Sequence, residues 1–140
     1  MNNYDKAKKA YYKAFKDINV KENEKIVLES KTTWCYNFAR DIPGADIKDH
    51  EQVIIEIKDL ELSYFFARNV SGADIKAHEQ VILSGKDAKM SFFFARDIPG
   101  ANIEEHFKVV FNSGDKNWFN YFIDYVNYKG TKVEEWLMYI

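Results

Sequence analysis

The sequence has almost none of the features that mark a secreted, membrane-bound or disulfide-linked protein. It contains one cysteine, Cys35, which leaves no partner for an internal disulfide. No stretch approaches the roughly 18 consecutive apolar residues that a membrane span requires. The N-terminal segment also lacks the apolar run of a signal peptide. These absences favour a cytoplasmic location.

Sequence signatures of catalysis and of metal binding are also missing. The chain contains no GxGxxG or GxxxxGKS/T phosphate-binding loop, no HExxH zinc motif, no GxSxG nucleophile motif and no pair of cysteines. We therefore expect a protein that is not an enzyme and that uses no cofactor and no metal.

No charge of one sign dominates the chain, because 20 lysines and arginines stand against 22 aspartates and glutamates, for a net charge of −2. The chain as a whole is therefore not expected to have the positive field that holds a nucleic acid. The first 18 residues are locally basic, with apolar residues at helical spacing. We favour a packed helix with a solvated lysine face over a phosphate-binding arm. The lysines are Lys6, Lys8, Lys9, Lys13 and Lys16, and the apolar residues are Tyr4, Tyr11, Tyr12, Phe15 and Ile18.

What the chain does have is a repeat of 28 residues. The segment FARDIPGADIKDHEQVI begins at Phe38, FARNVSGADIKAHEQVI begins at Phe66, and FARDIPGANIEEHFKVV begins at Phe94. Self-similarity at this period is typical of stacked arrays, in which each unit covers the apolar face of its neighbour.

Each repeat has the pattern of two short helices joined by a turn. In the third copy, Met90, Phe94 and Ile98 recur every four residues, as in an amphipathic helix that Asp87 could cap. A Pro-Gly pair then ends this helix, and Asn102 could cap a second one. We predict an all-α fold, an α-solenoid of about five antiparallel helix hairpins. It would be a single domain, 1–140, with degenerate end units 1–31 and 116–140 and clear repeats 32–59, 60–87 and 88–115.

The three histidines, His50, His78 and His106, occupy the same position in the three clear repeats. In a stack they would be about 8–10 Å apart, which is the packing distance between helices, whereas zinc ligands lie about 2 Å from one metal. A shared zinc site is therefore implausible. His50 lies between Ile47 and Ile54 on the apolar stripe, which favours a packed or hydrogen-bonded structural histidine over a catalytic one.

Two sets of polar residues are candidates for contact with a partner. The first is the arginine ladder, Arg40, Arg68 and Arg96, near the ends of the first helices of the repeats. A cation there suits the helix dipole and can bond the last carbonyls. The alternative is a row of guanidinium groups that binds carboxylates or phosphates. The second set comprises exposed positions of the second helices, namely Lys48, Asp49, Gln52, Lys76, Gln80, Glu104, Glu105 and Lys108.

The last residues of the chain are apolar, where a capping repeat normally has a polar outer face. The candidate patch consists of Trp136, Met138, Tyr139 and Ile140. Such a patch commonly marks a surface for a partner or for self-association. We expect it to bind a partner protein, which could be a second copy of the chain in a homodimer.

The phrase FARDIPGADIKxHEQ, carried by residues 38–52, 66–80 and in part 94–108, resembles a short helical repeat of largely uncharacterised proteins of bacteria and their phages. A small acidic protein without catalytic motifs is also similar in type to phage-encoded inhibitors of bacterial immunity, including the anti-CRISPR proteins. These resemblances imply an inhibitor that docks on a nucleoprotein defence complex in the bacterial cytoplasm and blocks it sterically. The alternative is a nucleic-acid-binding repeat protein that uses the lysine-rich first helix and the arginine ladder.

Overall fold

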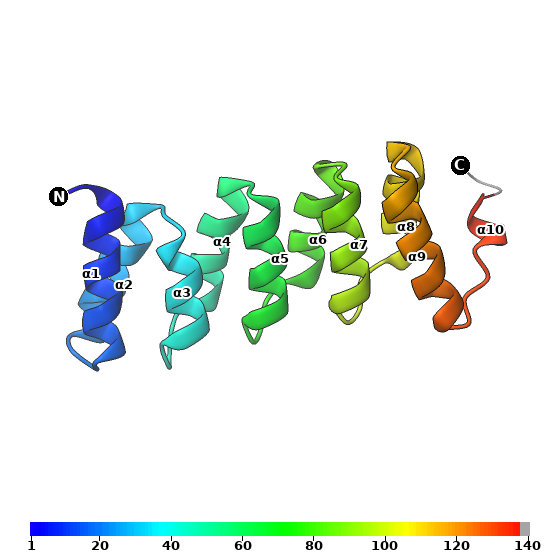
Figure 1. Ribbon diagram of the computed structural model, residues 1–140. Coiled ribbons are helices and arrows are strands. Elements are labelled where there is room, and N and C mark those ends of the chain that lie inside the picture. Colours follow the sequence, from blue (N-terminus) through cyan, green and yellow to red (C-terminus); the bar gives the residue numbers. More distant parts are fainter. Residues whose placement is uncertain (138–140) are drawn as a thin grey trace. The chain divides into compact units, whose positions relative to one another are not determined.

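The computed structural model describes residues 1–137, which form ten α-helices and no strand (Figure 1). The all-α class predicted from the sequence is confirmed for these residues. The helices are α1 (Asn3–Phe15), α2 (Val20–Ser30), α3 (Trp34–Asp41), α4 (Ile47–Ile57), α5 (Leu60–Asn69), α6 (Ile75–Ser84), α7 (Ala88–Asp97), α8 (Ile103–Ser113), α9 (Lys116–Tyr128) and α10 (Glu134–Leu137).

The chain divides into two compact units, Met1–Asp74 and Ile75–Ile140. In the first unit, α1, α3 and α5 pack side by side in one layer, and α2 and α4 form a second layer (Figure 1). In the second unit, α7 packs on α9 and α6 packs on α8, while α7 and α8 join the two layers. Each unit therefore has its helices in two packed layers. The single repeat domain expected from the sequence stays a prediction.

Local signals in the sequence set the helix ends. The side chain of Asp87 accepts a hydrogen bond from the backbone N–H of Met90, and that of Asn102 accepts one from Glu105, so both are N-caps as predicted. Asp115 caps α9 through the N–H groups of Asn117 and Trp118 in the same way. Gly100 has φ +84° in the turn between α7 and α8, a conformation that side chains disfavour.

The core of the first unit is built from the apolar faces that the periodicity identifies. Phe38, Ile54 and Phe66 have no exposed surface, and Val27 from α2 closes the same cluster. Each such side chain contributes about 1.5–3 kcal/mol on burial. The apolar residues at these repeated positions therefore hold neighbouring hairpins together.

Helix α1 packs differently from the prediction. Of its five apolar candidates only Tyr11 is buried, whereas Phe15 is 62% exposed and Tyr4, Tyr12 and Ile18 are also exposed. The buried face consists instead of Ala7, Ala10 and Ala14 together with Tyr11. Small side chains let α1 approach α2 closely, so the large rings are displaced toward solvent. The lysine-covered face is present, but the expected apolar face was wrong.

The second unit has an aromatic core. Phe92 and Phe122 lie with ring centroids 5.6 Å apart, and Phe107 contacts Phe122 at 5.5 Å. Trp136 is partly buried and its ring lies 5.4 Å from that of Phe107. The predicted exposed patch at the C-terminus is therefore corrected at Trp136, which packs into the core. The other three residues of the patch, Met138, Tyr139 and Ile140, lie outside the described residues.

Candidate functional site

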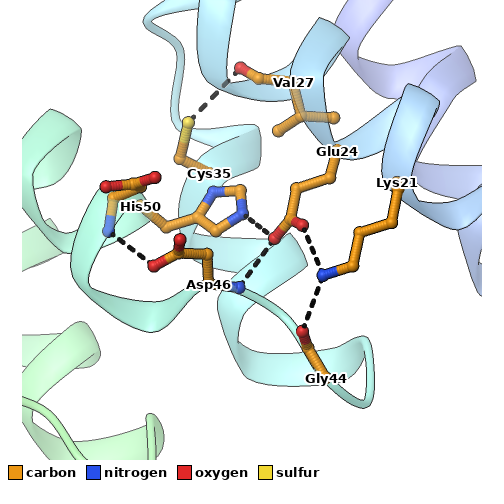
Figure 2. Close-up of polar contacts among 8 residues, drawn as sticks. Lys21, Glu24, Val27, Cys35, Gly44, Asp46 and His50 are labelled. Carbon is orange, nitrogen blue, oxygen red and sulfur yellow. Dashed lines mark hydrogen bonds and ion pairs between the residues drawn. The ribbon is translucent and has the colours of Figure 1, made fainter.

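The first polar site in the structure joins a glutamate of one hairpin to a histidine of the next. Glu24 lies on α2, and its Oε2 atom is 2.9 Å from Nε2 of His50 on α4 (Figure 2). The same oxygen accepts the backbone N–H of Asp46 at 2.7 Å. Lys21 places Nζ 3.5 Å from the other oxygen of Glu24 and 3.4 Å from the carbonyl oxygen of Gly44. One carboxylate thus ties α2 to the N-terminal end of α4.

The second unit repeats this geometry. Oε2 of Glu79 is 3.0 Å from Nε2 of His106 and accepts the backbone N–H of Asn102 at 2.6 Å. Within the first unit, Glu51 likewise accepts the backbone N–H of Asp74 at 2.7 Å. We call the Glu24–His50 and Glu79–His106 contacts the glutamate–histidine pairs.

The histidines of the pairs are neutral in the fold. Burial lowers the pKa of His50 and of His106 below the usual value, although the hydrogen bond to the glutamate acts in the opposite direction. A neutral ring that carries its proton on Nε2 donates to the carboxylate. Its Nδ1 atom then has no hydrogen-bond partner among the described residues. The ring of His50 stacks on Phe38, with centroids 5.0 Å apart and planes 20° apart.

The pairs are closed to solvent. His50 and His106 have no exposed surface, and the side chains of Glu24 and Glu79 are only 7% and 8% exposed. A substrate cannot reach such a pair, and the histidine approaches its carboxylate through one nitrogen only. Within residues 1–137 no three His, Cys, Asp or Glu side chains gather as a metal site would require. The geometry is that of a structural contact between neighbouring hairpins.

We expect the free energy of unfolding to fall as the pH is lowered from 7.5 to 5.5. Both histidines are neutral in the fold, whereas in the unfolded chain they take up protons near pH 6.5, so acid favours unfolding. This stabilisation is complete above about pH 6.5 and is lost as the pH falls through the lowered folded pKa. The slope should approach about 1.4 kcal/mol per pH unit for each histidine. Urea titrations at several pH values measure it.

Two controls accompany that measurement. The double variant with His50→Gln and His106→Gln should show a flatter pH dependence, because it lacks two of the three histidines that take up protons on unfolding. In the wild-type protein, the NMR signals of the two rings should remain those of neutral imidazole at pH 6.5. A stability that increases on acidification would show instead that the folded chain holds charged histidines.

Two of the three arginines of the ladder, Arg40 and Arg96, bind an aspartate of the same chain. Arg40 donates from Nε and Nη2 to the two carboxylate oxygens of Asp41, both at 2.7 Å, and its guanidinium lies 5.0 Å from the ring centroid of Tyr36. Hydrogen bonding from Arg40 lowers the pKa of Asp41. Tyr11 on α1 also donates to Asp41, at 2.6 Å. Arg96 makes the same bidentate contact with Asp97, at 2.7 and 2.9 Å.

The guanidinium groups of Arg40 and Arg96 bind the following aspartate and lie over aromatic rings. The helix-end role expected for the ladder stays a prediction. Arg68 is followed by Asn69, whose Nδ2 donates to the hydroxyl of Tyr36 at 2.8 Å. The ladder is therefore not uniform.

The exposed positions of the second helices lie where the sequence places them, although they are not equally open. Lys48, Asp49, Gln52, Lys76, Gln80 and Glu105 are exposed, whereas Glu104 and Lys108 are half-buried. Lys108 lies 3.6 Å from Glu104 and 3.5 Å from Glu105. Ion pairs between side chains that remain partly in contact with solvent contribute little, about 0–1 kcal/mol. On α8, Glu104, Glu105 and Lys108 lie together as a local cluster of charges.

An aromatic position on the first helices was missed in the sequence. Phe65 is 38% exposed on α5, and the same repeat position carries Phe93 on α7 and Tyr121 on α9, which is 56% exposed. The 28-residue spacing of these three aromatics was a sufficient signal. In α5 and α7 the arginine of the ladder follows three residues later, on the same side of the helix.

Cys35 is a packing residue rather than a reactive thiol. It has no exposed surface, its Sγ lies 3.4 Å from the carbonyl oxygen of Val27, and burial raises its pKa to about 12. We expect no reaction with Ellman's reagent at pH 8 in the folded protein and one thiol per chain in 6 M guanidinium chloride. Rapid labelling of the folded protein would contradict this.

Comparison with known proteins finds no matching family model, no matching curated protein and no matching solved structure. Over the described part of the chain, no helix combines the length and apolar character needed to cross a membrane.

Proposed function

We propose that this chain is a non-catalytic helical-repeat protein that acts by binding another protein. The observation that carries the proposal is an exposed aromatic residue on a first helix of each unit, Phe65 on α5 and Tyr121 on α9, with the exposed Arg68 one turn from Phe65. Aromatic residues and arginine are enriched at protein interfaces and supply most binding hot spots. A rigid helix presents them at low entropic cost.

The rest of each unit serves as a scaffold for these residues. The glutamate–histidine pairs join one hairpin to the next, while the exposed residues differ between repeats. We propose that the repeats continue as one α-solenoid, since each hairpin leaves an apolar face for a neighbour.

Direct nucleic-acid binding is the second candidate, and the charges of the ladder weigh against it. Asp41 and Asp97 neutralise Arg40 and Arg96 through bidentate contacts, so these two guanidinium groups have few donors left for phosphates. The net charge of −2 gives no long-range attraction. The lysines of α1 remain the feature that favours this candidate.

The narrower proposal is an inhibitor of a bacterial nucleoprotein defence complex, acting in the cytoplasm by steric blocking. It is supported by the resemblance in type and by a surface suited to protein contact. A reconstituted defence nuclease would test it, because addition of the purified chain should abolish target cleavage. Unchanged cleavage by the complexes tested would remove those complexes as targets.

Affinity capture with matched variants tests the broader proposal. The wild-type chain is compared with a double variant of the two exposed aromatic residues, Phe65→Ala with Tyr121→Ala, in bacterial lysate treated with nuclease. A second double variant, Gln52→Ala with Gln80→Ala, alters exposed positions of α4 and α6 and is the control. We expect one stoichiometric protein with the wild type and the control, reduced at least about tenfold with the aromatic variant.

The other outcomes decide against the proposal. Captured material that disappears after nuclease treatment, with affinity that falls steeply with salt, would favour nucleic-acid binding. Equal capture by all three proteins would show that Phe65 and Tyr121 are not part of the binding surface.

A further inference from the structure

The three arginines of the ladder occupy one repeat position but do not share one environment. Arg40 and Arg96 each hold the carboxylate of the next residue through Nε and Nη2, at 2.7–2.9 Å. Next to Arg68 the chain has Asn69, an amide without charge. The middle repeat therefore has the arginine but not the neighbouring carboxylate that is present in the other two clear repeats.

The substitution leaves the surrounding contacts in place. Nδ2 of Asn69 donates to the hydroxyl of Tyr36 at 2.8 Å, just as Asp41 accepts the hydroxyl of Tyr11 at 2.6 Å. The tie between neighbouring hairpins is thus preserved with donor and acceptor exchanged. Only the charge partner of the arginine has been removed.

The guanidinium of Arg68 is exposed and loosely held. Its Nη1 lies 3.4 Å from the hydroxyl of Tyr64, and its central carbon lies 5.9 Å from the centroid of that ring. No ion pair is recorded for Arg68 among the described residues of the chain. Among the described residues no acceptor is recorded for Nε and Nη2 of Arg68, the groups that bind aspartate in the other two repeats, and the residue is exposed.

We propose that Arg68 binds a carboxylate side chain of the partner protein, with Phe65 as the adjoining apolar contact. This inference rests on the proposed function and names the chemistry of its central contact. Phe65 and Arg68 lie three residues apart on α5 and are both exposed, so one partner segment can reach both. The planar fork of arginine matches a carboxylate through two parallel hydrogen bonds.

A carboxylate is a better occupant than a nucleic-acid phosphate. The other two clear repeats show that this position, flanked by an aromatic ring, accommodates a carboxylate at 2.7 Å. A phosphate backbone would need further cations beside Arg68, whereas the nearest charged residue on the exposed part of α5 is Glu61. An acidic protein segment needs only the single fork.

The test is a titration of the full chain followed by NMR of the arginine Nε–Hε groups. The probes are an octaglutamate peptide and, as its neutral match, an octaglutamine peptide. We expect octaglutamate to shift the Arg68 signal at least about fivefold more than those of Arg40 and Arg96, whose forks are occupied. Octaglutamine should shift none of them.

Two single substitutions exchange the environments within the ladder. Asn69→Asp supplies the missing carboxylate, keeps a contact to Tyr36 available, and should remove the Arg68 response without loss of stability. Asp41→Asn should create a response at Arg40. An Arg68 shift that persists in the Asn69→Asp protein, or no difference among the three arginines, would overturn the proposal.

Affinity capture separates this inference from the function beneath it. If Asn69→Asp and Arg68→Ala bind the captured protein as tightly as the wild type, the carboxylate contact is wrong while protein binding stands. If the wild type captures no protein, the proposed function fails, and the peptide titration still decides the chemistry of Arg68. Loss of single-stranded DNA binding in Arg68→Ala would overturn it in favour of phosphate.

Discussion

Replacing Glu24 by alanine is expected to lower the free energy of unfolding by about 2–6 kcal/mol. The single oxygen Oε2 of Glu24 accepts both the ring N–H of His50 and the backbone N–H of Asp46. Each buried donor that loses its acceptor costs about 1–3 kcal/mol. Because the ring has no exposed surface, water cannot replace the lost oxygen without opening the interface between α2 and α4. Urea denaturation followed by circular dichroism at pH 7.5 measures the change.

Glu29→Ala is the matched control, since it removes a glutamate from the same helix. The side chain of Glu29 is 67% exposed, and its Oε1 atom lies 4.0 Å from Nζ of Lys25, which is a weak ion pair. We therefore expect the free energy of unfolding to change by no more than about 0.5 kcal/mol. Glu24→Gln should lie between the two, because an amide oxygen can still accept from a neutral histidine. If Glu24→Gln were as destabilising as Glu24→Ala, the charge rather than the hydrogen bonds would carry the stability.

The parts of the fold that the sequence predicts are those fixed by local interactions. The capping of α7 and α8 by Asp87 and Asn102 requires only residues within three positions, and these caps are confirmed. The apolar stripe of Phe38 and Ile42 follows from a helical period that any stacked hairpin must satisfy. Local chemistry and the 28-residue period are therefore enough for the all-α class.

The glutamate–histidine pairs could not be derived in the same way, because their members lie 26 and 27 residues apart. Glu51 and Glu79 directly follow a histidine in the sequence, but neighbouring helix residues point in different directions and therefore do not pair with each other. The true partner of each histidine is one repeat away. The signal was present, since a glutamate that recurs at a buried period is costly unless it is paired.

The first helix shows a second limit of reasoning from the sequence. Helical spacing is common to both faces of α1, so the period alone could not decide whether Ala7 and Ala10 or the larger rings face the core. Burial of the alanine face depends on how closely α2 approaches, which is a tertiary property. The exposed rings of Tyr12 and Phe15 are a consequence of that choice.

The contact that corresponds to the glutamate–histidine pairs is aromatic between α8 and α10. In the third repeat Phe107 takes the position of Glu51 and Glu79, and in the last unit Trp136 takes the position of the histidines. The two rings lie 5.4 Å apart, so an aromatic contact stands where the earlier repeats have a hydrogen-bonded pair. An apolar contact at this position contains no buried charge that would need a partner.

Phe107→Ala is accordingly expected to lower the free energy of unfolding by about 3–5 kcal/mol. Phe107 has no exposed surface and contacts Phe119, Phe122 and Trp136 at centroid distances of 5.4–5.8 Å. Its removal leaves a cavity and takes the support from the ring of Trp136, so tryptophan fluorescence should shift to the red. Phe111→Ala, on the same helix but 42% exposed, should cost well under half as much. A change at Phe107 no larger than that at Phe111 would mean that α10 is not held by this contact.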